Sequence, residues 1–161
     1  MLARRSLLAF ALGLACCALP ACSPPPDLKQ AAEVADVSSG WFDAGIVEGK
    51  NKLVPSITFR LKKKSGVSIS TVSLNVVFKQ VGVEEHFDEV YVQRVDFKGD
   101  ETDPITVRAT VGYTGDPPQT RAEMLKNSYF KDMEAQVFAK AGSAQWVALH
   151  NLTIVRQLLT K

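Results

Sequence analysis

Hydrophobic and polar residues alternate along most of the chain after residue 50. Over residues 53–62 the apolar members of this alternation are Leu53, Ile57, Phe59 and Leu61, with polar or basic residues between the last three. A period of two is typical of a strand with one buried face. Similar alternation predicts strands over residues 71–79, 87–95, 105–111, 133–140 and 145–154, and we expect another over residues 41–47.

One short helix interrupts this pattern. Thr120 and Glu123 have the spacing of a capping box, in which the hydroxyl and the carboxylate each accept from a backbone amide at the helix start. Pro117 and Pro118 end any earlier helix, because proline lacks the amide hydrogen that a helix interior needs. The spacing therefore predicts a helix over residues 121–127.

About seven short strands and one helix predict an all-β fold. Strands at this spacing favour an antiparallel β-sandwich of the immunoglobulin or fibronectin type. Within residues 57–78, Phe59, Arg60 and Leu61 precede a polar turn, which is followed by a Val-rich strand ending in Phe78. This stretch resembles the FxLYD-type domains of bacterial lipoproteins, and the resemblance implies the same sandwich.

The first 22 residues differ from the rest. They contain no acidic residue and all three cysteines, and Arg4 and Arg5 precede a nearly continuous apolar run over residues 7–19. This layout is typical of a secretory signal peptide. The run is too short for a membrane-spanning helix. The paired arginines leave open whether export follows the general or the twin-arginine route.

Leu19, Pro20, Ala21 and Cys22 resemble the lipobox of bacterial lipoproteins. The resemblance implies that Cys22 is lipidated, becomes the first mature residue and attaches the protein to the membrane. In this family an aspartate directly after the cysteine favours retention in the inner membrane. Ser23 occupies that position here, so the resemblance further implies that the protein is attached to the outer membrane and faces the periplasm. The alternative is ordinary signal-peptidase cleavage. We therefore expect a signal peptide over residues 1–21, a lipidated, Pro-rich tether over 22–33 and the β-sandwich over 34–161.

Charge and cysteine content narrow the function. The chain has 19 basic and 17 acidic residues, for a net charge of +2. This balance argues against binding to nucleic acid, because such proteins carry an excess of basic residues to replace phosphate counterions. No cysteine follows Cys22, so the exported domain has no internal disulfide and depends on its hydrophobic core.

An acidic stretch around His86 and Asp88 is the candidate metal site. Imidazole and carboxylate groups ligate zinc and harder cations. On an extended strand, however, neighbouring residues point to opposite faces, which separates these ligands. We therefore favour a solvated hairpin whose charges protect a sheet edge.

The loop over residues 112–118 is the candidate partner-binding site, through Tyr113, Thr114 and Asp116. A tyrosine between glycines anchors partner proteins because it buries a large area at small entropic cost. The alternative is that Tyr113 packs on its own domain.

The two histidines and the serines have no recognisable nucleophile arrangement. We expect a non-catalytic, cofactor-free envelope lipoprotein that binds or assembles with another protein. The alternative is a metal-binding or enzymatic domain around His86.

Overall fold

The computed structural model describes residues 27–64 and 66–159, which form ten strands and two short helices. The protein is therefore all-β in its main features. The predicted signal peptide and Cys22 lie outside the described residues. In chain order the first elements are α1 (Leu28–Ala31), β1 (Ala32–Val47), β2 (Lys50–Lys63), β3 (Thr71–Gln80), β4 (His86–Lys98) and β5 (Glu101–Thr102). They are followed by β6 (Ile105–Arg108), β7 (Tyr113–Gly115), α2 (Arg121–Lys126), β8 (Met133–Lys140), β9 (Val147–Thr153) and β10 (Leu158–Leu159).

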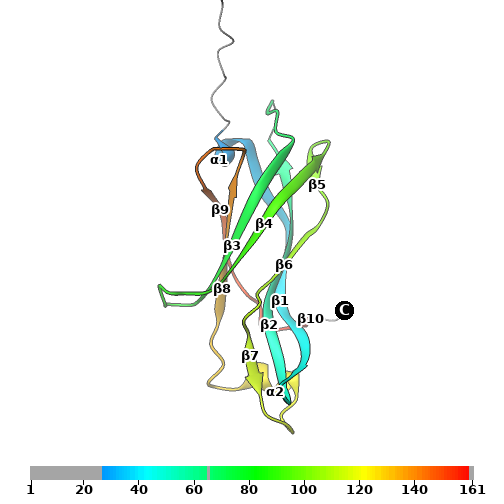
Figure 1. Cartoon of the computed structure of the whole chain (residues 1–161), viewed down its shortest axis with the longest axis vertical. Coiled ribbons are helices and arrows are strands. Elements are labelled where there is room, and N and C mark those ends of the chain that lie inside the picture. Colours follow the sequence, from blue (N-terminus) through cyan, green and yellow to red (C-terminus); the bar gives the residue numbers. More distant parts are fainter. Residues whose placement is uncertain (1–26, 65, 160–161) are drawn as a thin grey trace, which may run out of the picture.

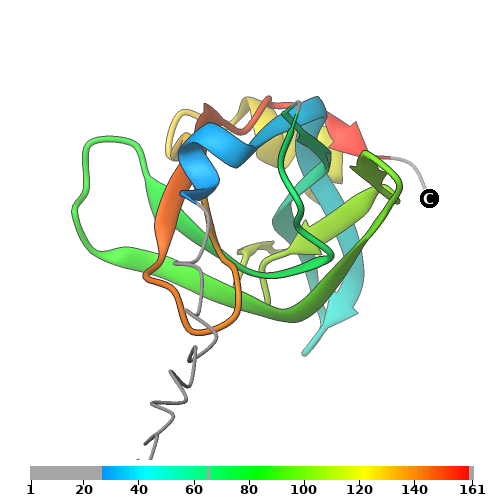
Figure 2. The same cartoon turned by 90° about the horizontal axis from the view of Figure 1, so that it is seen from above.

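All ten strands belong to one curled sheet, in the order β10-β1-β2-β5-β4-β3-β8-β9 (Figures 1 and 2). β6 and β7 pair with β2 beside this path. The two-residue strand β5 links β2 to β4 and so joins the two arms of the sheet. All pairs are antiparallel except β1 with β10, which are parallel. Neither helix is long and apolar enough to cross a membrane.

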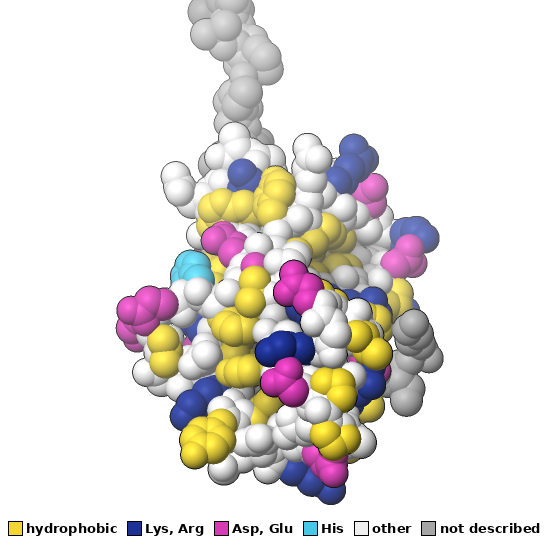
Figure 3. Space-filling view, turned by 60° about the horizontal axis from the view of Figure 1, so that its bottom comes forward, with side chains coloured by type: hydrophobic (Ala, Val, Ile, Leu, Met, Phe, Trp, Pro, Cys, Tyr) yellow, Lys and Arg dark blue, Asp and Glu magenta, His cyan; other side chains and the backbone are white. Residues whose placement is uncertain are grey.

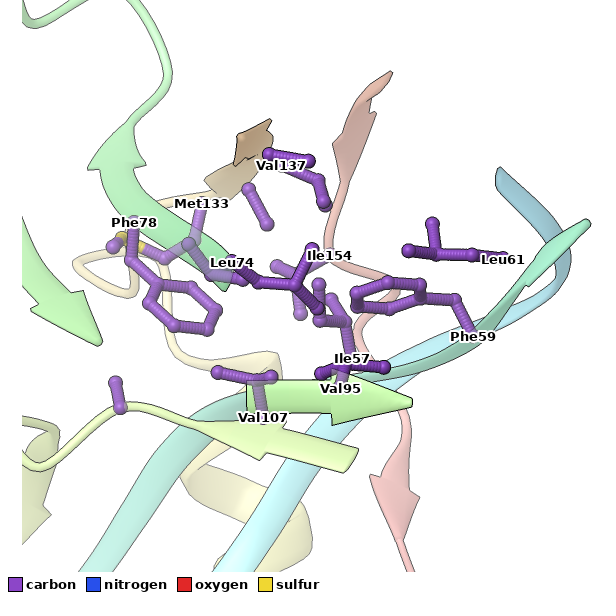
Figure 4. Close-up of a cluster of buried hydrophobic side chains, with 14 of the residues drawn as sticks. Ile57, Phe59, Leu61, Leu74, Phe78, Val95, Val107, Met133, Val137 and Ile154 are labelled. Atoms are coloured by element: carbon purple, nitrogen blue, oxygen red, sulfur yellow. The ribbon is translucent and has the colours of Figure 1, made fainter. Parts of the chain in front are cut away.

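The core lies within the curl, where the two arms meet. Alternate residues of β8 are buried along its whole length, as a period of two requires. Figure 4 shows that side chains of β2, β3, β4, β6 and β8 and of the segment after β9 converge there; the labelled ones are Ile57, Phe59, Leu61, Leu74, Phe78, Val95, Val107, Met133, Val137 and Ile154. The apolar faces that the sequence predicted for these strands therefore meet in a single core.

The folded region begins earlier than the boundary predicted at residue 34. The side chain of Asp27 accepts from the amide of Lys29 and caps α1. Leu28, only 1% exposed, belongs to the core, and the amide of Lys64 donates to the carbonyl of Ala31. Residues 28–33 are thus part of the domain rather than of a tether. The sequence did not predict this earlier start, because a single leucine shortly after three prolines shows no hydrophobic periodicity.

The C-terminal segment, residues 154–159, packs across β1. Ile154 is buried, Gln157 accepts from the amide of Trp41 at 2.8 Å, and the amide of Val155 donates to Ser39 Oγ at 3.1 Å. A Cβ atom at Gly40 would lie 2.8 Å from the side chain of Leu159. Glycine is therefore needed at this position for β10 to approach β1.

Most predicted strands are present, with different bounds. β1 begins at Ala32 rather than at residue 41, because a register shift between Ala35 and Ser38 and the positive φ of Asp36 (52°) break its alternation. The predicted last strand ends at Thr153, and the short strands β5, β7 and β10 were not predicted. β7 lies within the predicted loop over residues 112–118, where Tyr113, Thr114 and Gly115 pair with β2. The capping box at Thr120 is confirmed by both of its hydrogen bonds.

Candidate binding site

Helix α2 is fixed at one end of the domain. The side chain of Glu123 accepts from the amide of Thr120 at 2.7 Å, and Thr120 Oγ1 accepts from the amide of Glu123 at 3.3 Å. The bonds from Thr120 lower the pKa of the Glu123 carboxyl. The helix buries Met124 and Leu125. The capping box thus fixes where these two side chains enter the domain.

Four aromatic rings pack together beside α2. Tyr113, on β7, has its ring centroid 5.5 Å from that of Trp41, 4.6 Å from that of Phe130 and 5.9 Å from that of Phe87. Aromatic pairs at these separations are attractive beyond the area they bury. Burial raises the pKa of the Tyr113 hydroxyl, so this group stays neutral at neutral pH. Tyr113 is therefore half-buried and packs on its own domain.

A small pocket lies on the other side of Tyr113. It encloses about 120 Å³ and is lined by Tyr113, Thr114, Gln119, Met124, Asn127, Tyr129 and Phe130. We call it the α2 pocket. Sites for small molecules usually measure about 300–1,000 Å³, whereas a cavity of about 150 Å³ holds a benzene ring. The α2 pocket therefore has room for one side chain of a partner and not for a cofactor.

Tyr129 stands at the rim of the α2 pocket. Its side chain is 85% exposed, although its backbone is held by the side chain of Asn127, which accepts from the Tyr129 amide at 2.9 Å. Figure 3, which brings this end forward, shows hydrophobic side chains in small groups separated by charged and polar ones. An exposed aromatic beside a small pocket is typical of an interface anchored by a few residues.

The three partner-binding residues predicted from the sequence occupy different places. Tyr113 forms the floor of the α2 pocket and Thr114 part of its wall. Asp116 points away and pairs with Lys50, its Oδ1 atom 3.2 Å from Nζ. The sequence analysis missed Tyr129 and Phe130, because an isolated aromatic pair between two polar stretches has no periodicity to mark it.

The predicted metal-site residues are not brought together as ligands. His86 is exposed, and its Nδ1 atom lies 3.7 Å from a carboxylate oxygen of Glu89. Asp88 Oδ2 accepts from the amide and hydroxyl of Thr110 and from the amide of Val111. Among the described residues, no group of three or more histidine, cysteine or acidic side chains is placed to hold a metal ion. Asp88 instead joins β4 to the segment after β6.

Asp88 gives the fold a pH dependence. Burial raises the pKa of its carboxyl, but the hydrogen bonds from Val111 and Thr110 outweigh burial and hold the pKa below its ordinary value. A carboxyl whose pKa is lower in the folded protein than in the unfolded chain stabilises the folded protein. This stabilisation is complete above the pKa of the unfolded chain, about 3.9, and is lost as the pH falls through the pKa of the folded protein.

We therefore expect Asp88→Asn to lower the free energy of unfolding by about 1 kcal/mol at pH 7, a modest value because the group is partly exposed. The difference from the wild type should shrink as the pH falls from about 5 to 2. Urea unfolding at several pH values measures it. Asp100→Asn, at an exposed turn, is the matched control, and an equal pH response in both variants would contradict this role for Asp88.

Comparison with known proteins places the chain in no family. No family model matches it, and no curated protein matches its sequence significantly.

Proposed function

We propose that this protein is a non-catalytic, lipid-anchored lipoprotein of the bacterial envelope that binds a partner protein through the α2 pocket. The observation that carries the proposal is the position of this pocket. α1 and α2 lie at opposite ends of the domain (Figure 1), and the chain that leads from Cys22 enters at the α1 end.

The length of the connecting chain sets the orientation of the domain. Residues 23–27 separate Cys22 from α1, and even a fully extended segment of this length spans only about 20 Å. A lipid on Cys22 would therefore keep the α1 end near the bilayer. The α2 pocket would then face away from the membrane, where another envelope protein can reach it.

The lipobox resemblance supports the location. It favours lipid attachment at Cys22, and Ser23 favours the outer membrane, with the domain in the periplasm. Attachment by several acyl chains is stable, whereas one chain binds only weakly.

The finer fold class also belongs to this proposal. We infer an immunoglobulin-like sandwich, because one arm, β10-β1-β2 with β6 and β7, packs its apolar side chains against those of the other arm, β4-β3-β8-β9. The continuity through β5 and the parallel β1 and β10 pair are departures from two separate antiparallel sheets.

Replacing Cys22 tests the anchor. We expect Cys22→Ser to release the protein from membranes, because the thiol that carries the lipid is lost. Cys17→Ser, five residues earlier in the apolar run, is the control and should leave the protein attached. Membrane fractionation with mass measurement of the mature N-terminus checks both. Membrane retention of Cys22→Ser with an unmodified N-terminus would contradict the anchor.

A photoreactive residue at position 129 tests the pocket. In intact cells we expect it to crosslink to one distinct protein, because Tyr129 is the exposed rim of the α2 pocket. A photoreactive residue at Val81, which is also exposed and lies in the turn between β3 and β4, is the matched control. Thr114→Arg should abolish the crosslink, since the longer side chain at the pocket wall blocks entry. Crosslinking that persists in Thr114→Arg would show that the pocket is not the contact.

A further inference from the structure

A second surface lies between β4 and β6. Both strands leave β5 at the same corner of the sheet (Figure 1), but they pair with different neighbours. Over residues 86–96, β4 pairs only with β3, and β6 pairs only with β2. Between them is a groove of about 400 Å³ lined by Val90, Val92, Thr106, Val107 and Arg108, which we call the β4–β6 groove.

The register shows which backbone groups of β6 face this groove. The amide of Ala109 donates to the carbonyl of Pro55, and Val107 pairs with Ile57. In an antiparallel pair, alternate residues direct their amide and carbonyl groups toward the partner strand. Val107 and Ala109 therefore face β2, and the backbone groups of Thr106 and Arg108 face the β4–β6 groove.

The same reasoning applies to β4. The amide of Val81 donates to Asp132, in the register that pairs β3 with β8, so the odd-numbered residues of β3 face β8. The even-numbered residues of β3 then direct their backbone groups toward β4. They bond to even-numbered residues of β4, as in the pair of Val76 with Val90. The backbone groups of Tyr91, like those of Glu89, consequently point into the groove.

Both ends of the groove are closed. At one end Phe97 of β4 pairs with Thr102 of β5. At the other, Asp88 accepts through Oδ1 from the Glu89 amide and through Oδ2 from the Thr110 amide. These amides belong to the same two rows as those of Tyr91 and Thr106. At this end the carboxylate of Asp88 accepts the hydrogen bonds of both rows. Along the rest of the groove, the carbonyl groups of an added strand would accept them.

The middle of this edge lacks the usual protection. Charged side chains keep exposed strand edges from pairing with other chains. On β4 the charged residues Glu89 and Arg94 lie on either side of the middle of the groove, not in it. Residues 90–93 between them, Val-Tyr-Val-Gln, are uncharged. The open edge thus coincides with apolar side chains below it, which is the combination that binds extended peptides by strand addition.

We infer that the β4–β6 groove binds an extended segment of a partner polypeptide, which adds to the sheet as a strand with apolar residues inward and an acidic residue outward. We expect the outward residue of the bound segment to be acidic because it would lie beside Arg108. Its guanidinium lies 3.6 Å from the ring centroid of Phe42, and it forms no ion pair with any described carboxylate. The free edge strand β9 of a second copy contains no acidic residue, which disfavours self-association here. The inference stands independently of the anchor and of the α2 pocket.

A pentapeptide probe tests it on the purified protein. The probe is acetyl-Thr-Val-Glu-Val-Thr-amide, and its matched control has lysine in place of glutamate. We expect the glutamate peptide to slow hydrogen exchange of the Tyr91, Thr106 and Arg108 amides, followed by NMR, and to bind about tenfold more tightly than the lysine peptide.

Two variants make the test specific. Thr106→Pro removes one amide that faces the groove and leaves the backbone hydrogen bonds to β2, so we expect binding to weaken by about tenfold. Thr106→Ala keeps the amide, loses only the bond to Thr58 and should bind normally. Arg108→Glu changes no backbone group and should reverse the charge preference.

Three results would overturn the proposal. One is no protection by the glutamate peptide, and another is unchanged binding by both Thr106→Pro and Arg108→Glu. The third is protection that appears without peptide and grows with protein concentration, since the groove would then bind a second copy.

Discussion

Trp41→Ala should lower the free energy of unfolding by about 4 kcal/mol, the usual cost of removing a large buried aromatic side chain. Trp41 is 0% exposed and packs its ring 4.5 Å from that of Phe130 and 5.5 Å from that of Tyr113, measured between centroids. Its removal leaves a cavity beneath the floor of the α2 pocket. We expect the variant to unfold at lower denaturant concentration with a similar slope.

Trp41→Phe is the matched control. The Nε1 atom of Trp41 is buried and has no hydrogen-bond partner among the described residues. Phenylalanine keeps a packed ring and removes this unsatisfied donor, so the two effects partly offset and the cost should be about 1 kcal/mol. Equal costs for the two variants would show that the packed ring is not what stabilises this region.

Leu28→Ala should cost about 3 kcal/mol, in the range for a fully buried leucine. Leu28 lies in the core cluster although it precedes the first strand, and α1 packs against β9. The result decides whether the domain begins at α1 or after it. Denaturant unfolding of the variant measures the loss.

Lys29→Ala is the control for Leu28. It changes the neighbouring residue of the same helix, whose side chain is exposed, and should cost less than about 0.5 kcal/mol. If Leu28→Ala is as mild as this control, α1 does not stabilise the domain, which would then begin at β1.

The sequence predicted those parts of the fold in which one periodic face meets one core. Residues 71–79 and 133–140 alternate with one break each, at Val77 and Phe138, and they form β3 and β8 in the middle of their arm. β1 was predicted only from Trp41, because the register shifts on either side of it change which residues face inward. Such shifts arise from pairing with β2 and leave no local signal.

The candidate sites show a similar limit. The unusual sequence around Tyr113 marked residues 112–118 as a candidate site, but the pocket also needs Phe130 and Met124 from two other segments. The hairpin predicted at the acidic stretch is present as the antiparallel pair of β3 and β4, but the bond from Thr110 to Asp88, which spans 22 residues, was not predicted. Contacts between segments far apart in the chain depend on topology, which hydrophobic periodicity does not encode.

The parallel pair of β1 and β10 also determines when folding can finish. Residue 41 pairs with residue 158, so the outer edge of the first strand is covered only by the last one. A chain that emerges from the ribosome N-terminus first holds β1 without this neighbour until residue 158 has emerged. Closure of the sheet at β1 is therefore a late step. Until β10 arrives, this edge of β1 has unpaired backbone groups that can bond to a strand of another chain.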